Sequence, residues 1–149
     1  MNAFAAAGAG FLLAVLWFDL MFDVQVIGLQ QRELPEEVLA SIARYYRRVT
    51  TTARPMNLLI ALVMLATLAA VVVEIVRGPG APWVGWASLA AIVPPIALAR
   101  VRTVPNAVRL GARNDPRERQ SALARVIYRD HIACAAAILT LLVLQLAFA

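Results

Sequence analysis

Two carboxylates lie four residues apart in an otherwise apolar stretch near the start of the chain, LWFDLMFDVQ (16–25). In a helix, Asp19 and Asp23 would share one face with Gly8, Leu12 and Val15. Because an ionised aspartate that faces lipid is costly, we expect this face to turn into the protein. A carboxyl group held between hydrocarbon and arginine can be tuned as a general base. The pair is therefore a candidate for acid–base chemistry.

Three further apolar segments also carry side chains that could take part in such chemistry. In a bundle, these side chains would lie at the same depth in the membrane as Asp19. Counted from the start of the first apolar stretch, Asp19 lies about 24 Å along a helix that rises about 1.5 Å per residue. The chain has a single histidine, the only side chain that titrates near neutral pH. We predict that the catalytic residues are Asp19, Asp23 and His131, and that Asn57, Arg102 and Asn106 bind substrate and orient an oxyanion.

Two alternatives for the acidic pair remain open at this point. The aspartates could form ion pairs with Arg54, Arg100 or Arg102, which would only hold the helices together. Together with His131, they could also supply the two carboxylates and one imidazole of a non-haem metal site. Nothing in their spacing demands a metal. We therefore predict no cofactor and no metal, with a single metal ion as the alternative.

Three short motifs stand where the apolar segments begin or end: RPMN (54–57), VPN (104–106) and YRDH (128–131). With the chain length, they resemble the four-helix membrane family that includes the anthrone oxygenases, over most of the chain. The sequence departs from that family where Ile127 or Tyr128 replaces a tryptophan and where no arginine follows His131. The resemblance implies oxygenation of an activated aromatic molecule without a bound cofactor, with Asn106 and His131 catalytic. A base would remove an acidic C–H proton, and the carbanion would react with O₂.

Four apolar segments must position these residues. The chain has 149 residues, of which 62% are hydrophobic, whereas a soluble domain is about half apolar. A bilayer is crossed by about 20 mostly apolar helical residues. We therefore predict one domain (1–149) of the all-α class, an integral membrane four-helix bundle with cytoplasmic helical extensions. The approximate spans are 3–27, 55–77, 82–102 and 128–149, and the helical loops are 30–54 and 103–127.

The positive charges predict the orientation of the bundle. All 14 are arginines, the net charge is +5, and most lie in the two long loops. The positive-inside rule places these loops in the cytoplasm and both termini outside it, in the cell (inner) membrane. Tyr45, Tyr46 and Tyr128 would then lie toward the inner interface. We expect the arginines to attract anionic lipid headgroups and not nucleic acid.

Both long loops are predicted to contain helix. Val38, Leu39, Ile42, Tyr45 and Val49 recur at helical spacing, which predicts an amphipathic helix over about 35–53. This helix would lie on the membrane surface or continue the second span as a stalk. The motif DPRE (115–118) is typical of a helix start, and no breaker follows it, so residues 116–148 could form one helix. In the first span, small residues recur every four positions at 6, 10 and 14, which favours close helix packing.

These features predict a small polytopic membrane protein and leave its activity open. The sharpest hypothesis is a membrane-embedded oxygenase- or oxidoreductase-like enzyme that acts on a small lipophilic molecule in a cytoplasm-facing polar pocket. One alternative is a transporter or channel subunit, although no charge lies near the bilayer midplane, where transport sites usually lie. Another is a non-catalytic assembly or lipid-interacting protein. A homo-oligomer is compatible with all three. The single cysteine excludes an intramolecular disulfide relay.

Overall fold

The computed structural model describes residues 2–78 and 80–149, except for the side chain of Arg54. The described residues form helices and connecting loops and contain no strand, which confirms the predicted all-α class. The elements, in chain order, are α1 (Asn2–Asp23), η1 (Val24–Val26), α2 (Glu36–Arg47), η2 (Arg48–Thr52), α3 (Arg54–Arg77), α4 (Pro82–Leu98), η3 (Ala99–Thr103), α5 (Val104–Ala112) and α6 (Arg117–Ala147). Of the short elements, η1 is a 3-10 turn, whereas η2 and η3 are π-helical.

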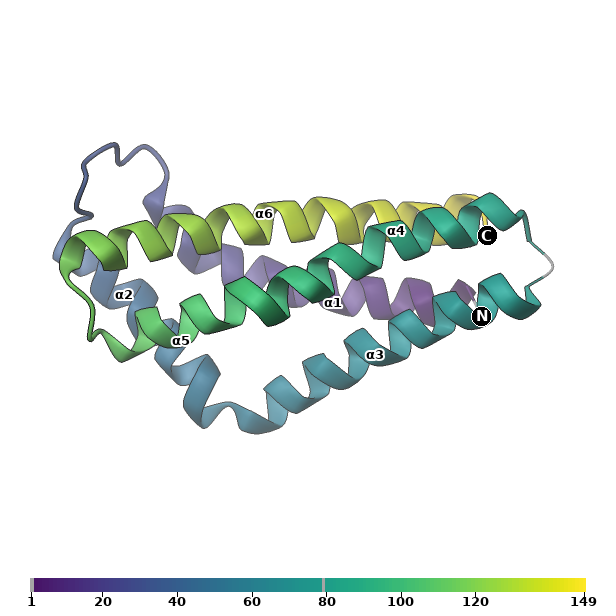
Figure 1. Cartoon of the computed structure of the whole chain (residues 1–149), viewed down its shortest axis with the longest axis horizontal. Coiled ribbons are helices and arrows are strands. Elements are labelled where there is room, and N and C mark those ends of the chain that lie inside the picture. The colour runs from purple at the N-terminus through teal and green to yellow at the C-terminus, as the bar shows by residue number, and fades with distance from the viewer. Residues whose placement is uncertain (1, 79) are drawn as a thin grey trace.

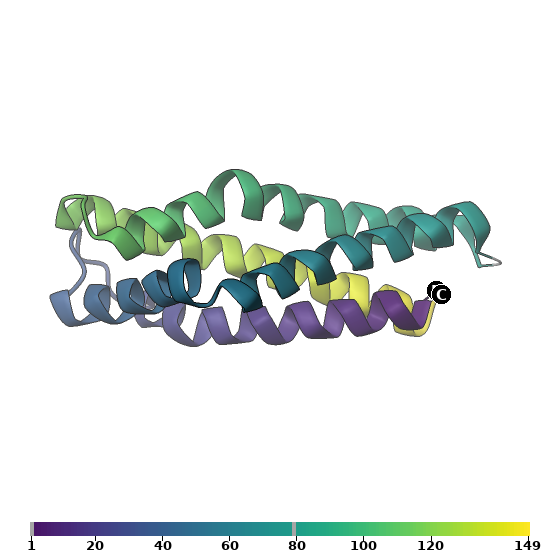
Figure 2. The ribbon, with the colours of Figure 1, turned by 90° about the horizontal axis from the view of Figure 1, so that it is seen from below.

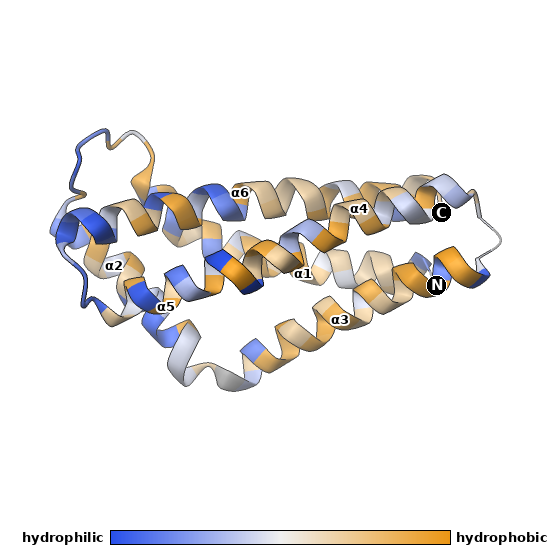
Figure 3. Ribbon diagram, viewed as in Figure 1, coloured by the Kyte–Doolittle hydropathy of each residue, from blue (hydrophilic) through white to orange (hydrophobic). Residues whose placement is uncertain are grey.

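Four helical segments are long and apolar enough to cross a membrane: Asn2–Val26, Pro55–Arg77, Pro82–Ala112 and Arg117–Ala147. They run along the long axis of the molecule and form a bundle (Figure 1). The two termini lie at one end, near the connection between α3 and α4, and α2 lies at the other end with α5 and the start of α6 (Figures 1 and 2). Hydrophilic residues gather at the α2 end, whereas the rest of the bundle is mostly apolar (Figure 3).

The third apolar segment extends further than the predicted span of 82–102. The π-helical turn η3 carries the chain from α4 directly into α5, so that one helical segment reaches Ala112. Pro105 does not stop it, because it falls in the first turn of α5, where proline is tolerated. The predicted loop 103–127 therefore consists of α5, a short turn and the first part of α6. The single helix predicted over 116–148 is confirmed as α6.

Helix α2 does not continue α3 as a stalk. It is separated from α3 by η2 and by Ala53, whose backbone is not helical, and it packs against α5. Leu39 and Ile42 of α2 are fully buried in the cluster that contains Leu110 of α5. Gly111 permits this close contact, because a Cβ atom there would lie 2.8 Å from the backbone nitrogen of Arg47. The helix thus closes the polar end of the bundle.

The buried apolar side chains form two clusters that lie one after the other along the bundle. Cluster one is built mainly by α2, α5 and the first half of α6, and cluster two by α1, α3, α4 and the second half of α6. Burial of each large side chain contributes about 1.5–3 kcal/mol in water. Cluster one contains Val26, Leu34, Leu39, Ile42, Ala43, Tyr46, Ala107, Leu110, Leu123, Ala124 and Ile127. Cluster two contains Ala5, Ala9, Leu12, Ala70, Val71, Ile92, Ile138 and Leu141.

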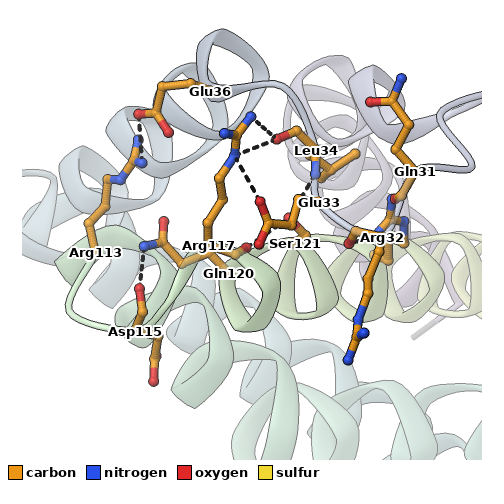
Figure 4. A network of polar contacts seen from close by, with 11 residues as sticks. Gln31, Arg32, Glu33, Leu34, Glu36, Arg113, Asp115, Arg117, Gln120 and Ser121 are labelled. Carbon is orange, nitrogen blue, oxygen red and sulfur yellow. Dashed lines mark hydrogen bonds and ion pairs between the residues drawn. The ribbon is translucent and has the colours of Figure 1, made fainter.

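The loop between η1 and α2 is fastened to the start of α6 (Figure 4). The Arg117 guanidinium donates to the carbonyl of Leu34 from Nε at 3.0 Å and from Nη2 at 2.9 Å. The backbone N–H of Leu34 donates to Ser121 Oγ at 2.9 Å. An ion pair between Arg113 and Glu36 joins the turn before α6 to the first residue of α2. These contacts fix the position of α2, which carries part of the candidate site.

Helix α1 approaches α3 closely at Gly8, whereas Gly10 of the predicted stripe of small residues makes no such contact. A Cβ atom on Gly8 would lie 1.9 Å from Thr67 Oγ1, whereas a Cβ atom on Gly10 would meet nothing within 4 Å. Gly8 belongs to the same helix face as the two aspartates. The face that turns inward is therefore the acidic one, as the sequence predicted.

Candidate functional site

A layer of polar side chains separates the two apolar clusters. On α6 it consists of Asp130 and His131, which follow Ile127 of cluster one and precede Ile138 of cluster two. On α1 it consists of Asp19 and Asp23, which point into the bundle as expected. Asp23 has no exposed surface. Four ionisable groups thus lie where the chain buries few compensating charges, so that each depends on a hydrogen-bond partner.

Asp23 holds the imidazole of His131 in one orientation. Its Oδ2 lies 2.6 Å from His131 Nδ1, and its Oδ1 accepts a hydrogen bond of 2.6 Å from the Tyr46 hydroxyl. A carboxylate offers only acceptor oxygens. The proton of the neutral imidazole must therefore lie on Nδ1, and the lone pair on Nε2. This is the arrangement in which a histidine can act as a base through Nε2.

A second pair of an acid and a tyrosine lies beside the first. The Tyr45 hydroxyl donates to Asp19 Oδ1 at 2.6 Å, and the Tyr45 ring stacks on Phe22 with the ring centroids 4.1 Å apart. Asp19 Oδ2 lies 3.9 Å from His131 Nε2. Because this separation is too long for a hydrogen bond, Nε2 keeps its lone pair free for another partner.

The two tyrosines act as hydroxyl donors. Burial, together with the nearby charges of Asp19 and Asp23, raises the pKa of both phenols above the ordinary value of 10.0. Loss of a phenolic proton would place a third negative charge next to the two carboxylates, out of contact with water. Tyr45 and Tyr46 therefore remain protonated and keep both carboxylates oriented.

The remaining acid of the layer, Asp130, is used for structure. Its Oδ2 accepts hydrogen bonds of 3.0 Å from Arg102 Nε and from the Thr103 hydroxyl, and its Oδ1 accepts a second bond from the Arg102 guanidinium. Asp130 is buried, whereas the Arg102 side chain is 54% exposed. The contacts bind the π-helical turn η3 to α6, which fixes one wall of the space beside His131.

A cavity of about 400 Å³ lies against this layer. Most of its lining side chains are apolar and come from α1, α3, α4, α5 and α6, and both π-helical turns contribute to its wall. Single π-helical turns occur frequently at functional sites. The size falls within the range of about 300–1,000 Å³ of small-molecule sites. The polar side chains that line it are Asp19, Tyr46, Thr50, Asn57, Thr103 and His131.

The structure brings together some of the predicted site residues. Asp19, Asn57 and His131 line the cavity, and Asp23 lies behind His131. The Asn57 amide donates to the carbonyl of Val49 at 2.5 Å, across the turn that joins α2 and α3. Arg102 and Asn106 do not line the cavity.

The two aspartates do not form the ion pairs with Arg100 or Arg102 that the sequence left open. Among the side chains that the structure describes, the titratable partner of both is His131, and Arg102 pairs with Asp130 instead. The side chain of Arg54 lies outside the described part. The reason is geometric, because Tyr45 and Tyr46 occupy the positions next to the carboxylates that a guanidinium would need.

Within the ranges 2–78 and 80–149, no three His, Cys, Asp or Glu side chains are placed to hold one metal ion. The carboxylates of Asp19 and Asp23 each accept a hydrogen bond from a tyrosine, and His131 Nδ1 faces Asp23. Asp19 Oδ1, both oxygens of Asp23 and His131 Nδ1 are thus directed at neighbouring side chains.

The sequence reasoning missed the two tyrosines, which it had assigned to the inner interface. A signal for Tyr46 was present, since it follows Leu39 and Ile42 at helical spacing and shares their buried face. It also missed Cys134, which lies one helical turn after His131 and lines the cavity. The cysteine adds a thiol that can be labelled close to the candidate base.

Comparisons of this chain with models of protein families, with curated proteins and with solved structures give no match.

Proposed function

We propose that this chain is a membrane enzyme that uses His131 as a general base on a small, weakly acidic lipophilic molecule. The observation that carries the proposal is the contact between His131 Nδ1 and the buried carboxylate of Asp23. It leaves Nε2 as the basic atom, in a residue that lines a mostly apolar cavity. A base oriented in this way contributes about 10²–10⁴-fold to the rate of a proton transfer.

Asp19 and Asp23 have different parts in this proposal. Asp23 is a positioning residue, since it holds the tautomer and orientation of the imidazole and stabilises the imidazolium that forms on proton uptake. Asp19 lines the cavity with its Oδ2 3.9 Å from His131 Nε2, so it lies where the substrate proton passes. Asn57 also lines the cavity, and the amide hydrogen that it does not donate to Val49 can be donated to an enolate oxygen.

The reaction class implied by the resemblance to the anthrone oxygenases is compatible with these groups. His131 removes a proton from a CH₂ group whose carbanion is conjugated with an aromatic ketone, and the carbanion reacts with O₂. One oxygen atom replaces the two hydrogens as a carbonyl, and the other leaves as water. The atoms and electrons balance, because O₂ is both the oxidant and the source of oxygen.

The membrane placement is part of the same proposal. Arg44, Arg47, Arg48 and Arg100 are exposed and form no ion pair among the described side chains. Exposed arginines at one end of the bundle favour a cytoplasmic position for that end and attract anionic headgroups. A C-terminal fusion to alkaline phosphatase, which is active only outside the cytoplasm, tests this orientation. An inactive but stable fusion would show that the C-terminus lies in the cytoplasm, which contradicts this orientation.

The catalytic proposal is tested with anthrone as the probe and the full chain in lipid nanodiscs. Under argon in D₂O, the wild type should accelerate deuterium uptake at the acidic CH₂ group. His131→Asn should lose this acceleration by about 10²–10⁴-fold, although its amide can still donate to Asp23 in place of Nδ1. The control is Glu37→Gln, which introduces an amide at an exposed position that does not line the cavity.

The outcomes separate the two parts of the proposal. Equal deuterium uptake in the wild type and in His131→Asn would overturn the assignment of the base. Deuterium uptake that depends on His131, but without O₂ consumption in air, would remove the oxygenase reaction and leave the general base. Consumption of one O₂ per anthrone, with formation of anthraquinone, would support both parts.

A further inference from the structure

The cavity opens at the side of the bundle. Three of its lining residues are themselves exposed, and they form its rim: Ala61 of α3, and Val104 and Val108 of α5. Val104 is 54% exposed and Val108 is 48% exposed. All three are apolar. The polar residues Asp19, Tyr46 and His131 lie deeper, so a molecule entering here meets hydrocarbon first and the ionisable groups last.

The packing of the helices explains why the opening lies there. Helix α3 packs against α1 and α4 and diverges from α5 toward the end where α2 lies (Figures 1 and 2). A π-helical turn precedes α3 on one side and α5 on the other, and both turns line the cavity. The wider turns keep the two helices apart at the point where the rim residues lie.

The surface around the rim is apolar. Leu58 and Leu62 on α3 and Val101 on η3 are strongly exposed next to it. Ala61 belongs to the membrane-compatible segment Pro55–Arg77, and Val104 to Pro82–Ala112. Exposed Arg100 and Arg109 flank the rim valines in the chain, which is the arrangement expected where hydrocarbon meets headgroups.

We propose that the substrate enters from the bilayer, sideways between α3 and α5, as an uncharged lipophilic molecule with one polar, weakly acidic group. That group reaches Asp19 and His131 while the apolar remainder fills the rest of the cavity. A charged, water-soluble molecule would have to lose its hydration at the apolar rim without gaining a partner there. The route rests on the proposed function for its substrate, but it can be measured without turnover.

Cys134 provides the measurement, because it is the only cysteine, lines the cavity and lies one turn from His131. The full chain in nanodiscs of phosphatidylcholine and phosphatidylglycerol is treated with N-phenylmaleimide or with the same maleimide carrying a sulfonate. Both faces of a nanodisc meet water, so either reagent can use any aqueous route. The labelling rate of each is measured by mass spectrometry and divided by its rate on the protein unfolded in dodecyl sulfate.

We expect the uncharged reagent to label Cys134 at least roughly tenfold faster than the sulfonate after this correction, because a charge is costly to move past apolar side chains. Ala61→Trp and Val108→Trp, which place a large ring on either side of the rim, should each slow the uncharged reagent several-fold. Leu62→Trp and Val101→Trp are the matched controls, because both positions are exposed beside the rim without lining the cavity. They should label like the wild type.

Two results would overturn the route: equal corrected rates for the two maleimides, or unchanged labelling in both rim variants when each elutes as a single folded species. His131→Asn distinguishes the route from the catalytic proposal, because it should lose turnover and still be labelled at the wild-type rate. Labelling that follows the expected pattern without any turnover would support the route and reject the enzyme. Turnover that requires His131, together with equal corrected rates for the two maleimides, would support the enzyme and reject the route.

Discussion

His131 Nδ1 lies 2.6 Å from Asp23 Oδ2, although the two residues are 108 positions apart in the chain. The contact joins the end of α1 to the middle of α6, and Tyr46 of α2 completes it from a third helix. A single buried carboxylate therefore holds three elements together and also selects the tautomer of the only histidine.

Removal of this carboxylate should lower stability as well as activity. In Asp23→Ala, the His131 N–H and the Tyr46 hydroxyl both lose their acceptor in a buried position, and we expect a loss of about 1–3 kcal/mol for each of the two groups. Asp23→Asn keeps one acceptor oxygen and should lose less. The measurement is thermal unfolding in detergent, with Glu37→Ala, which removes an exposed carboxylate, as control. Equal melting temperatures for Asp23→Ala and the wild type would show that the contact has no structural role.

Alkaline pH should destabilise the fold through the two tyrosines. The pKa of Tyr46 is raised in the folded state, mainly by burial. Above about pH 10, the unfolded chain therefore loses a proton that the folded chain keeps, and folding stability falls as pH rises. The slope is at most about 1.4 kcal/mol per pH unit for Tyr46. Tyr45 is half-buried, so its contribution is reduced by solvent screening.

The chain has no lysine, which leaves this pH range open to measurement. Unfolding is followed from about pH 9 to about pH 11 in the wild type, Tyr46→Phe and Tyr45→Phe. The Tyr46→Phe profile should fall least steeply, because phenylalanine has no proton to lose. Other groups that titrate there, including Cys134, are common to all three proteins and cancel in the comparison. Parallel profiles would contradict the buried, protonated state of Tyr46.

The contact between α1 and α3 at Gly8 should not tolerate a side chain. Gly8→Ala places a Cβ atom within 1.9 Å of Thr67 Oγ1, and overpacking of this kind costs about 1–3 kcal/mol. Thr67→Ala added to Gly8→Ala should restore part of the lost stability. Gly10→Ala is the control on the same helix, since its Cβ atom would meet nothing within 4 Å. If Gly10→Ala were the more harmful change, the close approach would lie at Gly10.

The pair of Arg102 and Asp130 should respond unequally to loss of either partner. Arg102→Met leaves the buried Asp130 carboxylate with only the Thr103 hydroxyl, whereas Asp130→Asn leaves a guanidinium that can still be solvated. We therefore expect the lower melting temperature for Arg102→Met. The double variant should melt above Arg102→Met, because no charge is then left buried. An additive double variant would show that the pair is not coupled.

Much of the fold could be predicted from the sequence. Four apolar segments of sufficient length predicted the four long helices, because helix length follows from local composition. The DPRE motif at 115–118 predicted where α6 starts, although α6 begins at Arg117 without a side-chain capping hydrogen bond. The spacing of Asp19 and Asp23 predicted their shared inward face, because an ionised side chain is costly in lipid. The direction in which the Asn106 side chain points could not be predicted by counting residues along a regular helix. A π-helical turn such as η3 adds residues to the helix, and each added residue rotates the following side chains by about 100°.

The sequence by itself therefore determined which segments are helical and which face of the first helix points inward, since these follow from periodicity and from the cost of a charge in hydrocarbon. Only the tertiary structure decided the partners of that face. Tyr45 and Tyr46 reach the aspartates because α2 folds back onto α5, where Gly111 allows the two backbones to approach closely. Such a docking depends on contacts between residues far apart in the chain, which no local pattern contains. Arginine was the partner favoured by charge alone, and the packing of α2 placed tyrosine and histidine there instead.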